Sequence, residues 1–102
     1  MSTLHTVNKS PFERSSFVSA LNHLHPGDAL LMMEDGVVGA RTGSAFAPRL
    51  GEVTKRCSVY VLGPDLAARG MAANDVIQGI KLVDYGGFVD LVTTHQRTQA
   101  WL

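Results

Sequence analysis

The run Ala29-Leu30-Leu31-Met32-Met33 places the strongest constraint on the fold of this chain. These five consecutive apolar residues follow Asp28 and precede Glu34-Asp35-Gly36. A strand that faced water on one side would alternate apolar and polar residues, so an unbroken apolar strand indicates burial on both faces. A parallel sheet covered by helices provides that environment, and we therefore predict an α/β fold.

Strand and helix patterns alternate along the rest of the chain. We expect strands at residues 3–8, 28–33, 57–62 and 81–84, and helices at residues 11–25, near residue 37, after residue 63 through residue 69, and at residues 86–95. Strands separated by helices imply crossover connections, which make parallel sheets. The pattern predicts a mainly parallel sheet of four or five strands with helices on both faces.

Local signals place several of these helix boundaries. Ser10 is a good N-cap, Pro11 suits the first helical position and Glu13 completes a capping box, so the first helix is expected to begin there. Gly70 is expected to end the helix that follows residue 63. In the last helix, one face carries Phe88, Leu91, Val92 and His95. Glycines and Pro48 interrupt residues 37–51, where we expect a short helix and then a loop.

Length and composition exclude several classes of protein. The 102 residues predict a single domain, with a hydrophobic fraction of 45% that is ordinary for a globular protein. The apolar run at residues 29–33 is too short to span a bilayer, and the N-terminal residues lack a basic segment followed by an apolar one, so we expect a cytoplasmic protein with no membrane partner. Nine basic residues balance nine acidic ones without a concentrated basic patch, which argues against direct nucleic-acid binding.

Carboxylates cluster at the expected carboxyl edge of the sheet, where ligands bind in open α/β folds. Asp35, Asp65 and Asp84 follow predicted strands, as does Glu34. They could bind a metal ion or act as an acid and base, whereas Asp65 and Asp84 could equally cap helices at strand-to-helix turns. For Asp65 and Asp84, helix capping is the favoured role. A ligand site at this edge remains the alternative.

The four histidines do not form a metal-binding pattern. His23 and His25 lie two residues apart near a helix end and are expected at the surface, pointing in different directions. His5 lies in the first strand and is expected to be hydrogen-bonded structure, and His95 lies near a helix C-terminus, where the helix dipole favours it. The chain also lacks a glycine-rich dinucleotide fingerprint and a Walker-type loop, so neither a metal nor a nucleotide cofactor is implied.

Four sequence blocks, taken in order, resemble the DsrH/TusB family. They are LHTVNKSPFER at residues 4–14, YVLGPDLAARG at residues 60–70, VDYGGFVDL at residues 83–91 and QAWL at residues 99–102. This family is the smallest subunit of the cytoplasmic sulfur-relay complexes DsrEFH and TusBCD, and the resemblance covers essentially the whole chain. It implies a DsrE-like, flavodoxin-like fold over residues 1–102.

The resemblance also implies partners and a function. The chain would be a non-catalytic structural subunit of a sulfurtransferase complex, with two copies each of itself, a DsrE/TusD-like subunit and a DsrF/TusC-like subunit. Persulfide sulfur would leave on a DsrC/TusE-type acceptor. The pathway would be either thiolation of the tRNA wobble uridine or dissimilatory sulfur oxidation, and residues 8–14 and 63–65 look more like the sulfur-oxidation members.

One departure from the family concerns cysteine. Members from sulfur oxidisers carry a cysteine at the position of Ala20, so the resemblance leaves this chain similar to members that rely on the cysteine of a sister subunit. Cys57 is the only cysteine here and lies at the start of a predicted strand, at the amino edge of the sheet. Burial as an inert residue is its favoured role, and a sulfur-carrying thiolate beside Lys55 and Arg56 is the minor alternative.

The residues Trp101-Leu102 form an apolar pair that is costly to leave in water. We expect this pair to dock, either over the last helix of the same chain or, slightly favoured, into a sister subunit, because interfaces enrich tryptophan. Two rival functions remain open. One is a small-ligand or metal-dependent enzyme that uses Asp35, Asp65 and Asp84, and the other is a homo-oligomeric interaction protein without a sulfur pathway.

Overall fold

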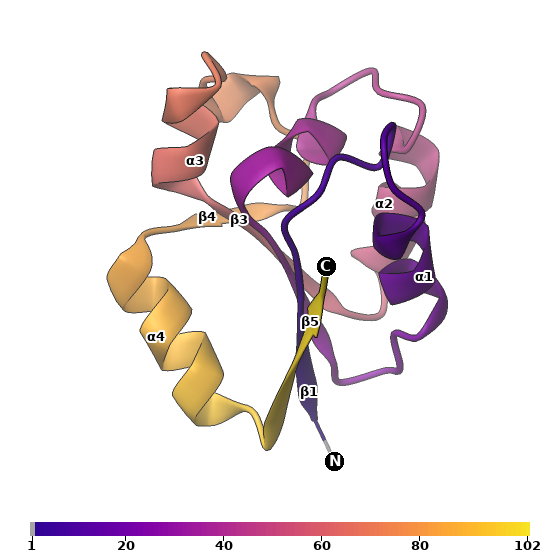
Figure 1. Cartoon of the computed structure of the whole chain (residues 1–102), viewed down its shortest axis with the longest axis vertical. Coiled ribbons are helices and arrows are strands. Elements are labelled where there is room, and N and C mark those ends of the chain that lie inside the picture. Colours follow the sequence, from indigo (N-terminus) through magenta and orange to yellow (C-terminus); the bar gives the residue numbers. More distant parts are fainter. Residues whose placement is uncertain (1) are drawn as a thin grey trace.

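A computed structural model describes residues 2–102, which form a five-stranded parallel sheet with helices on both faces (Figure 1). The predicted α/β fold is therefore confirmed. The strands are β1 (Thr3–Val7), β2 (Ala29–Met32), β3 (Ser58–Leu62), β4 (Lys81–Val83) and β5 (Arg97–Trp101), in the spatial order β4-β3-β2-β1-β5. All four neighbouring pairs run parallel, so the carboxyl ends of all five strands meet at one edge.

The apolar run at residues 29–33 forms the centre of the sheet, as its composition predicted. All four residues of β2 are buried, and β2 pairs with β1 on one side and with β3 on the other. Leu30 and Met32 point to one face, into the larger hydrophobic cluster, whereas Ala29 and Leu31 point to the opposite face, into a smaller cluster. Both faces of this strand therefore lack contact with water.

Two α-helices cover the first face of the sheet and one covers the second. Figure 1 shows α1 (Ser16–Asn22) and α2 (Ala47–Val53) on one side of the sheet and α4 (Tyr85–Thr94) on the other. The 3-10 helices η1 (Glu34–Ala40) and η2 (Ala73–Asp75) and the short helix α3 (Gly63–Ala68) complete the elements. The site discussed below depends on this unequal cover.

The first helix begins later than its capping signals predicted. Ser10, Pro11 and Glu13 form a separate turn, in which the carbonyl oxygen of Ser10 accepts the amides of Glu13 and Arg14, and α1 starts only at Ser16. The side-chain oxygen of Ser10 accepts the amide of Phe12, two residues on. The predicted cap therefore stabilises a turn, because the same hydroxyl geometry serves both motifs.

A second helix was missed because its proline and glycine were interpreted as interruptions. Helix α2 contains Pro48 in its first turn and Gly51 in its interior. A proline in the first turn lacks only an amide that has no partner inside the helix, so it does not prevent helix formation. Burial of Leu50 and Val53 against the sheet stabilises this helix despite its composition.

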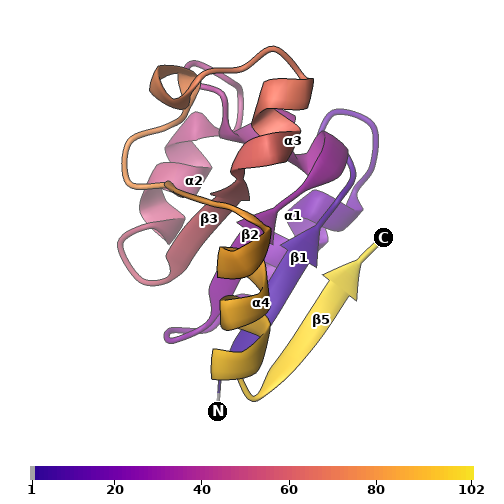
Figure 2. The ribbon, with the colours of Figure 1, turned by 90° about the vertical axis from the view of Figure 1, so that its left-hand side faces the viewer.

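The C-terminal residues form the fifth strand, which the sequence patterns did not place. Strand β5 pairs with β1, with Thr3 opposite Arg97 and Val7 opposite Trp101. Figure 2 shows β5 at the open edge of the sheet, beside rather than beneath α4. Because this pairing is parallel, the start of the described chain lies at the amino edge of the sheet and its end at the carboxyl edge (Figure 2), and the pairing determines where Trp101 lies.

Candidate functional site

Two of the carboxylates predicted at the carboxyl edge act as hydrogen-bond acceptors for helix starts. Asp84 is the N-cap of α4, and its Oδ1 accepts the amide of Gly87 at 2.8 Å. Asp65 Oδ2 accepts the amide of Glu34 at 2.6 Å, so it stabilises the start of η1 rather than of its own helix. The predicted capping role is therefore seen for Asp84, whereas Asp65 lies inside α3 and bonds to Glu34 instead of capping its own helix, a partner that sequence order could not reveal.

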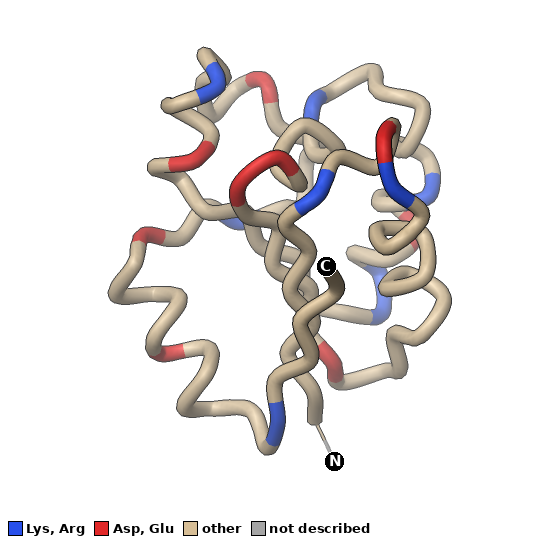
Figure 3. Tube along the Cα trace, in the orientation of Figure 1, with Lys and Arg blue, Asp and Glu red and all other residues tan. Residues whose placement is uncertain are grey.

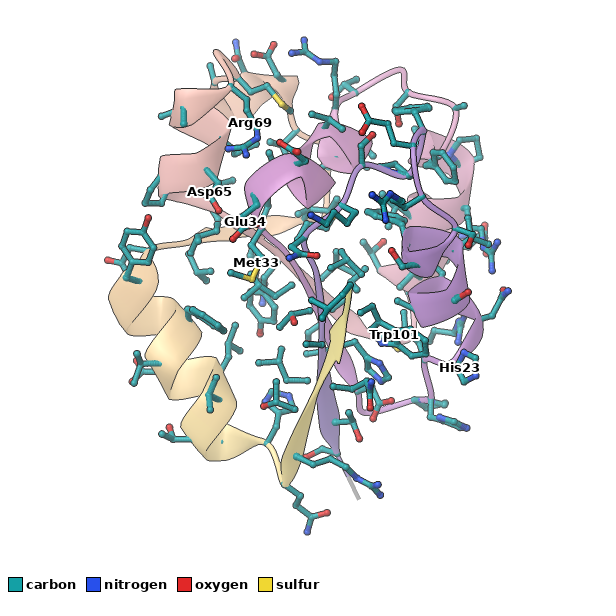
Figure 4. All side chains as sticks on the ribbon, viewed as in Figure 1. His23, Met33, Glu34, Asp65, Arg69 and Trp101 are labelled. Atoms are coloured by element: carbon teal, nitrogen blue, oxygen red, sulfur yellow. The ribbon has the colours of Figure 1, made fainter. Side chains whose placement is uncertain are left out.

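The third carboxylate, Asp35, forms an ion pair across the same edge. Its Oδ1 lies 2.8 Å from Nη2 of Arg69, and Figure 4 shows Arg69 directed toward Glu34 and Asp65. Glu34 adopts a φ of 49°, a conformation that non-glycine residues seldom take. The hydrogen bond from its backbone amide to the Asp65 carboxylate helps to hold this conformation. Among residues 2–102, no group of three or more His, Cys, Asp or Glu side chains is arranged to hold a metal ion.

Cys57 is buried at the amino edge, immediately before β3. Its side chain is 6% exposed, and its Sγ donates to the carbonyl oxygen of His25 at 3.3 Å. Burial raises the pKa of the thiol despite the opposing charge of Arg56, which disfavours the nucleophilic thiolate. Ala20, where related sulfur-oxidiser members carry cysteine, is also fully buried, on the inner face of α1.

A buried chain of polar side chains links β5 to the loop before β2. The indole Nε1 of Trp101 donates to Nδ1 of His5 at 3.0 Å, and His5 Nε2 lies 3.0 Å from Asp28 Oδ2. Because an indole nitrogen can only donate, Nδ1 accepts and the proton of the neutral imidazole is on Nε2, facing the carboxylate. His5 is therefore hydrogen-bonded structure, as predicted.

Asp28 is the charged centre of this buried chain. Burial alone would raise the pKa of its carboxyl group, but hydrogen bonds from the amide of His25, from the His5 ring and from the amide of Thr3 outweigh burial and lower the pKa. The hydrogen bonds from the backbone amides of His25 and Thr3 are 3.1 Å and 3.0 Å long, respectively. Sequence patterns do not identify Asp28, because Thr3 and His5 reach it only once β1 and β2 pair with Leu4 opposite Ala29.

A cleft of about 320 Å³ opens beside this chain, between β5 and the loop that follows α1. Its lining comes from β1 and β5 on one side and from the α1–β2 connection on the other: Thr3, His5, Arg97, Gln99 and Trp101, with His23, His25 and Asp28. Figure 4 shows Trp101 and His23 next to each other, and their ring centroids lie 5.0 Å apart. His23 and His25 are exposed, as predicted, but they contribute to one cleft rather than pointing apart.

Trp101 docks within its own chain, but not over the last helix. It packs against the hydrophobic cluster on the α1 side of the sheet, whereas α4 lies on the opposite side. The prediction that Trp101 could dock over α4 of its own chain was therefore wrong, because the pairing of β5 with β1 directs the indole to the other face of the sheet. Leu102 remains 78% exposed.

The outer surface of α4 exposes large apolar side chains. Tyr85 is 60% exposed, Val89 59% and Val92 40%, and these residues recur at i, i+4 and i+7, which places them on one stripe of the helix. Burial of Leu91 and Phe88 on the inner stripe agrees with the sequence prediction, but the prediction that Val92 belongs to it was wrong. Figure 3 shows α4 without lysine or arginine.

Leu82 of β4 is a further exposed apolar residue, near the carboxyl edge of the sheet. Its side chain is 43% exposed, and it lines a second cleft, of about 440 Å³, between β4 and the starts of α3 and α4. Gly63, Pro64, Val83, Asp84 and Gly87 complete the lining. We call Tyr85, Val89 and Val92 the α4 patch. Single exposed apolar residues are common, whereas a contiguous stripe indicates an interaction surface.

Comparisons with known proteins agree with this architecture. The family described as DsrH like protein matches residues 9–98. A protein named TusB from Pectobacterium parmentieri is 36% identical over 98 residues, with 96% of this chain and 99% of that protein covered. A TusB protein from Escherichia coli (strain K12) is 38% identical over 101 residues, with the same coverage.

Two solved structures share the fold at lower identity. The ychN protein from E. coli superimposes with a TM-score of 0.82 at 15% identity, covering 98% of this chain and 99% of that one. A protein of unknown function from Methanobacterium thermoautotrophicum superimposes with a TM-score of 0.77 at 18% identity, covering 97% and 96%. At these identities the two structures support the fold alone.

Proposed function

Since this chain belongs to the DsrH family, we propose that it serves as a structural subunit of a sulfur-relay complex, without a nucleophile of its own. In this role it binds DsrE/TusD-like and DsrF/TusC-like sister subunits in a hetero-hexamer. The complex passes persulfide sulfur to a DsrC/TusE-type acceptor in the cytoplasm. No helix among residues 2–102 is long and apolar enough to cross a membrane.

The α4 patch is the observation that carries this proposal. A small domain gains little by leaving a tyrosine and two valines in water, since each buried apolar side chain contributes about 1.5–3 kcal/mol. A sister subunit that covers the patch would bury these side chains and complete the thinly covered face of the sheet. Leu102, at the edge of the opposite face, is a second proposed contact, together with Trp101.

The surroundings of Cys57 support a non-catalytic role. Sulfur carriers need an accessible thiolate with a lowered pKa, whereas burial here raises the pKa of the thiol and its proton is donated to a carbonyl oxygen. A buried thiol of this kind packs as a small apolar group. The reactive cysteine of the complex would then belong to a sister subunit.

Coexpression with the two sister subunits tests the proposal. The unmodified chain should elute with both subunits in gel filtration, and Val89→Lys should reduce co-elution at least tenfold, because a charge would be buried in an apolar contact. Failure of the unmodified chain to bind either subunit would contradict the proposal.

A control variant on the same helix separates binding from folding. Thr94→Lys introduces the same charge at an exposed position on another side of α4, so it should co-elute like the unmodified chain. Both variants should retain the far-ultraviolet circular dichroism of the parent, since both positions are exposed. If Thr94→Lys blocked assembly as strongly as Val89→Lys, the α4 patch would not be the specific contact.

Deletion of the gene distinguishes the two pathways. Loss of 2-thiouridine from tRNA would assign the chain to wobble-uridine thiolation, whereas normal tRNA with impaired oxidation of stored sulfur would assign it to dissimilatory sulfur oxidation. An unaffected phenotype in both assays would contradict a role in either pathway.

A further inference from the structure

The hydrogen bond between Trp101 and His5 exists only while His5 is neutral. An indole nitrogen can only donate, so Nδ1 of His5 needs a free lone pair to accept the bond of 3.0 Å from Trp101 Nε1. A protonated imidazole carries a hydrogen on both ring nitrogens. The Nδ1–H group of His5 and the indole N–H would then face each other as two donors, and the bond between them would be lost.

The other ring nitrogen of His5 faces a partner that favours the opposite protonation state. Nε2 lies 3.0 Å from Oδ2 of Asp28, and both side chains are buried. The carboxylate also accepts the backbone amides of Thr3 and His25, and these bonds stabilise its ionised form. An ionised carboxylate at this distance stabilises an imidazolium. His5 therefore lies between Trp101, which requires its neutral form, and Asp28, which favours its charged form.

Titratable and charged side chains reach the surroundings of His5 from three segments. They are Asp28, His23 and His25 in the α1–β2 connection, Arg97 on β5, and Arg56 and Cys57 in the turn before β3. The positive charges of the arginines, and of the two neighbouring histidines once they are protonated, disfavour a charged His5, whereas Asp28 favours one. Asp28 is hydrogen-bonded to the ring, so the ion pair that it would form with His5 compensates for the lost bond to Trp101.

We propose that His5 is a pH-sensitive latch for the C-terminal strand. While His5 is neutral, it holds the indole of Trp101 at the end of β5. When His5 takes up a proton, it forms an ion pair with Asp28 and releases the indole N–H, which then bonds to water in the adjoining cleft of about 320 Å³. The stabilisation that the Trp101 bond gives to β5 is therefore present at higher pH and is lost as the pH falls through the titration of His5.

Strand β5 is the element that responds, because Trp101 is its main side-chain contact with the domain. β5 is an edge strand that pairs with β1 alone, and its other four residues are exposed. Trp101 is partly buried and packs against the hydrophobic cluster on the α1 side of the sheet. Loss of its hydrogen bond weakens this anchor next to Leu102, which is already exposed. The latch concerns the end of the chain itself and does not depend on the proposed role in sulfur relay.

The indole N–H signal of Trp101 gives a direct test in the full-length chain. The chain contains one tryptophan, so its ¹H–¹⁵N spectrum has one indole N–H resonance, and that group bonds to His5. Between about pH 8 and pH 5, where histidine rings titrate, this resonance should move with the same midpoint as the ring signals of His5. Over the same range, protection of the indole proton against exchange, relative to free tryptophan at each pH, should fall at least fivefold.

Matched glutamine variants identify the histidine responsible. His5→Gln has no titrating ring at this position and should remove the pH dependence of indole protection, whereas His23→Gln, which replaces the exposed histidine beside Trp101, should retain it. If His5→Gln does not fold, comparison of the two midpoints in the unmodified chain decides the matter. The proposal would be overturned by indole protection that follows the ring of His23, that stays unchanged while His5 titrates, or that still falls in His5→Gln. A His5 ring that does not titrate between about pH 8 and pH 5 would also overturn it.

Discussion

The two faces of the sheet are covered to different extents. On the face covered by α1 and α2, eighteen buried residues form one continuous cluster, which includes residues from η1 and α3 as well as from the sheet. On the other face the buried cluster has four residues, in which Leu4, Ala29 and Leu31 of the sheet pack with Leu91 of α4. We call these the closed face and the open face.

Because of this difference, substitutions on the closed face should affect the stability of the domain, whereas substitutions on the open face should affect its binding to other subunits. Side chains of the closed face are packed on all sides, so their removal leaves a cavity inside the domain. Tyr85, Val89 and Val92 on α4 face outward, where a substitution changes the surface and leaves the interior unaltered. The closed face therefore accounts for folding of the isolated chain, and the open face is the surface proposed to bind sister subunits.

The largest expected effect comes from the interior of the closed face. Phe17→Ala should lower the free energy of unfolding by about 3–5 kcal/mol, because Phe17 is fully buried and a large cavity would remain. Val89→Ala on the open face should change it by less than about 0.5 kcal/mol. Urea denaturation followed by circular dichroism measures both values, and equal losses would remove the distinction between the faces.

A smaller effect is expected at the amino end of the closed face. Asp28→Asn replaces an acceptor of three hydrogen bonds with a group that can accept fewer, so it should cost about 1–3 kcal/mol at neutral pH. The lowered pKa of Asp28 makes its contribution fully present above the ordinary value of 3.8 and lost as the pH falls through the lower folded value.

Unfolding measurements from pH 6 to pH 2.5 test this pH dependence. The difference between the unmodified chain and Asp28→Asn should narrow as the pH falls below about 3.8. A difference that stayed constant across this range would show that the carboxylate charge does not stabilise the fold.

A still smaller loss of stability is expected when the contact between β5 and the closed face is weakened. Trp101→Phe keeps an aromatic ring but removes the hydrogen bond from Nε1 to His5, so the free energy of unfolding should fall by about 1 kcal/mol. Amide exchange should accelerate mainly in residues 97–101, since this edge strand has only one neighbour. Uniform acceleration across the sheet would show that β5 unfolds together with the whole domain.

The smallest effect is expected for the cysteine. Cys57→Ser should leave sulfur transfer by the assembled complex within about threefold of the parent, because the thiol is buried and protonated. Transfer is measured with a sister-subunit persulfide as donor. Detection of a persulfide on Cys57 by mass spectrometry, together with an inactive serine variant, would show that the non-catalytic role proposed for Cys57 is wrong.

The strand and helix pattern was predictable wherever local sequence and burial agree. The apolar run of β2 predicted its central place because an unbroken apolar strand needs cover on both faces. Gly70, with a φ of 70°, follows α3 as predicted because glycine adopts this conformation without steric cost. The capping role of Asp84 was predictable for a similar reason, since the cap and its helix are adjacent in the chain.

Features that join distant segments were not predictable in the same way. The exposed strand β5 has no apolar alternation, and only its pairing with β1 makes it a strand. Glu34 lies 31 residues from Asp65 and His5 lies 23 residues from Asp28, so these bonds follow from packing and register rather than from local preference. Gly51 disfavours α2 locally, and burial of Leu50 and Val53 against the sheet overrides it.

The sequence by itself therefore determined the fold class, the family and the burial expected for its cysteine, because these depend on residue order and apolar pattern. Only the tertiary structure decided which side of the sheet receives Trp101, which side of α4 remains exposed, and which polar groups surround Asp28. Strand register and sheet order set these positions, and both arise from contacts between segments that lie far apart in the chain.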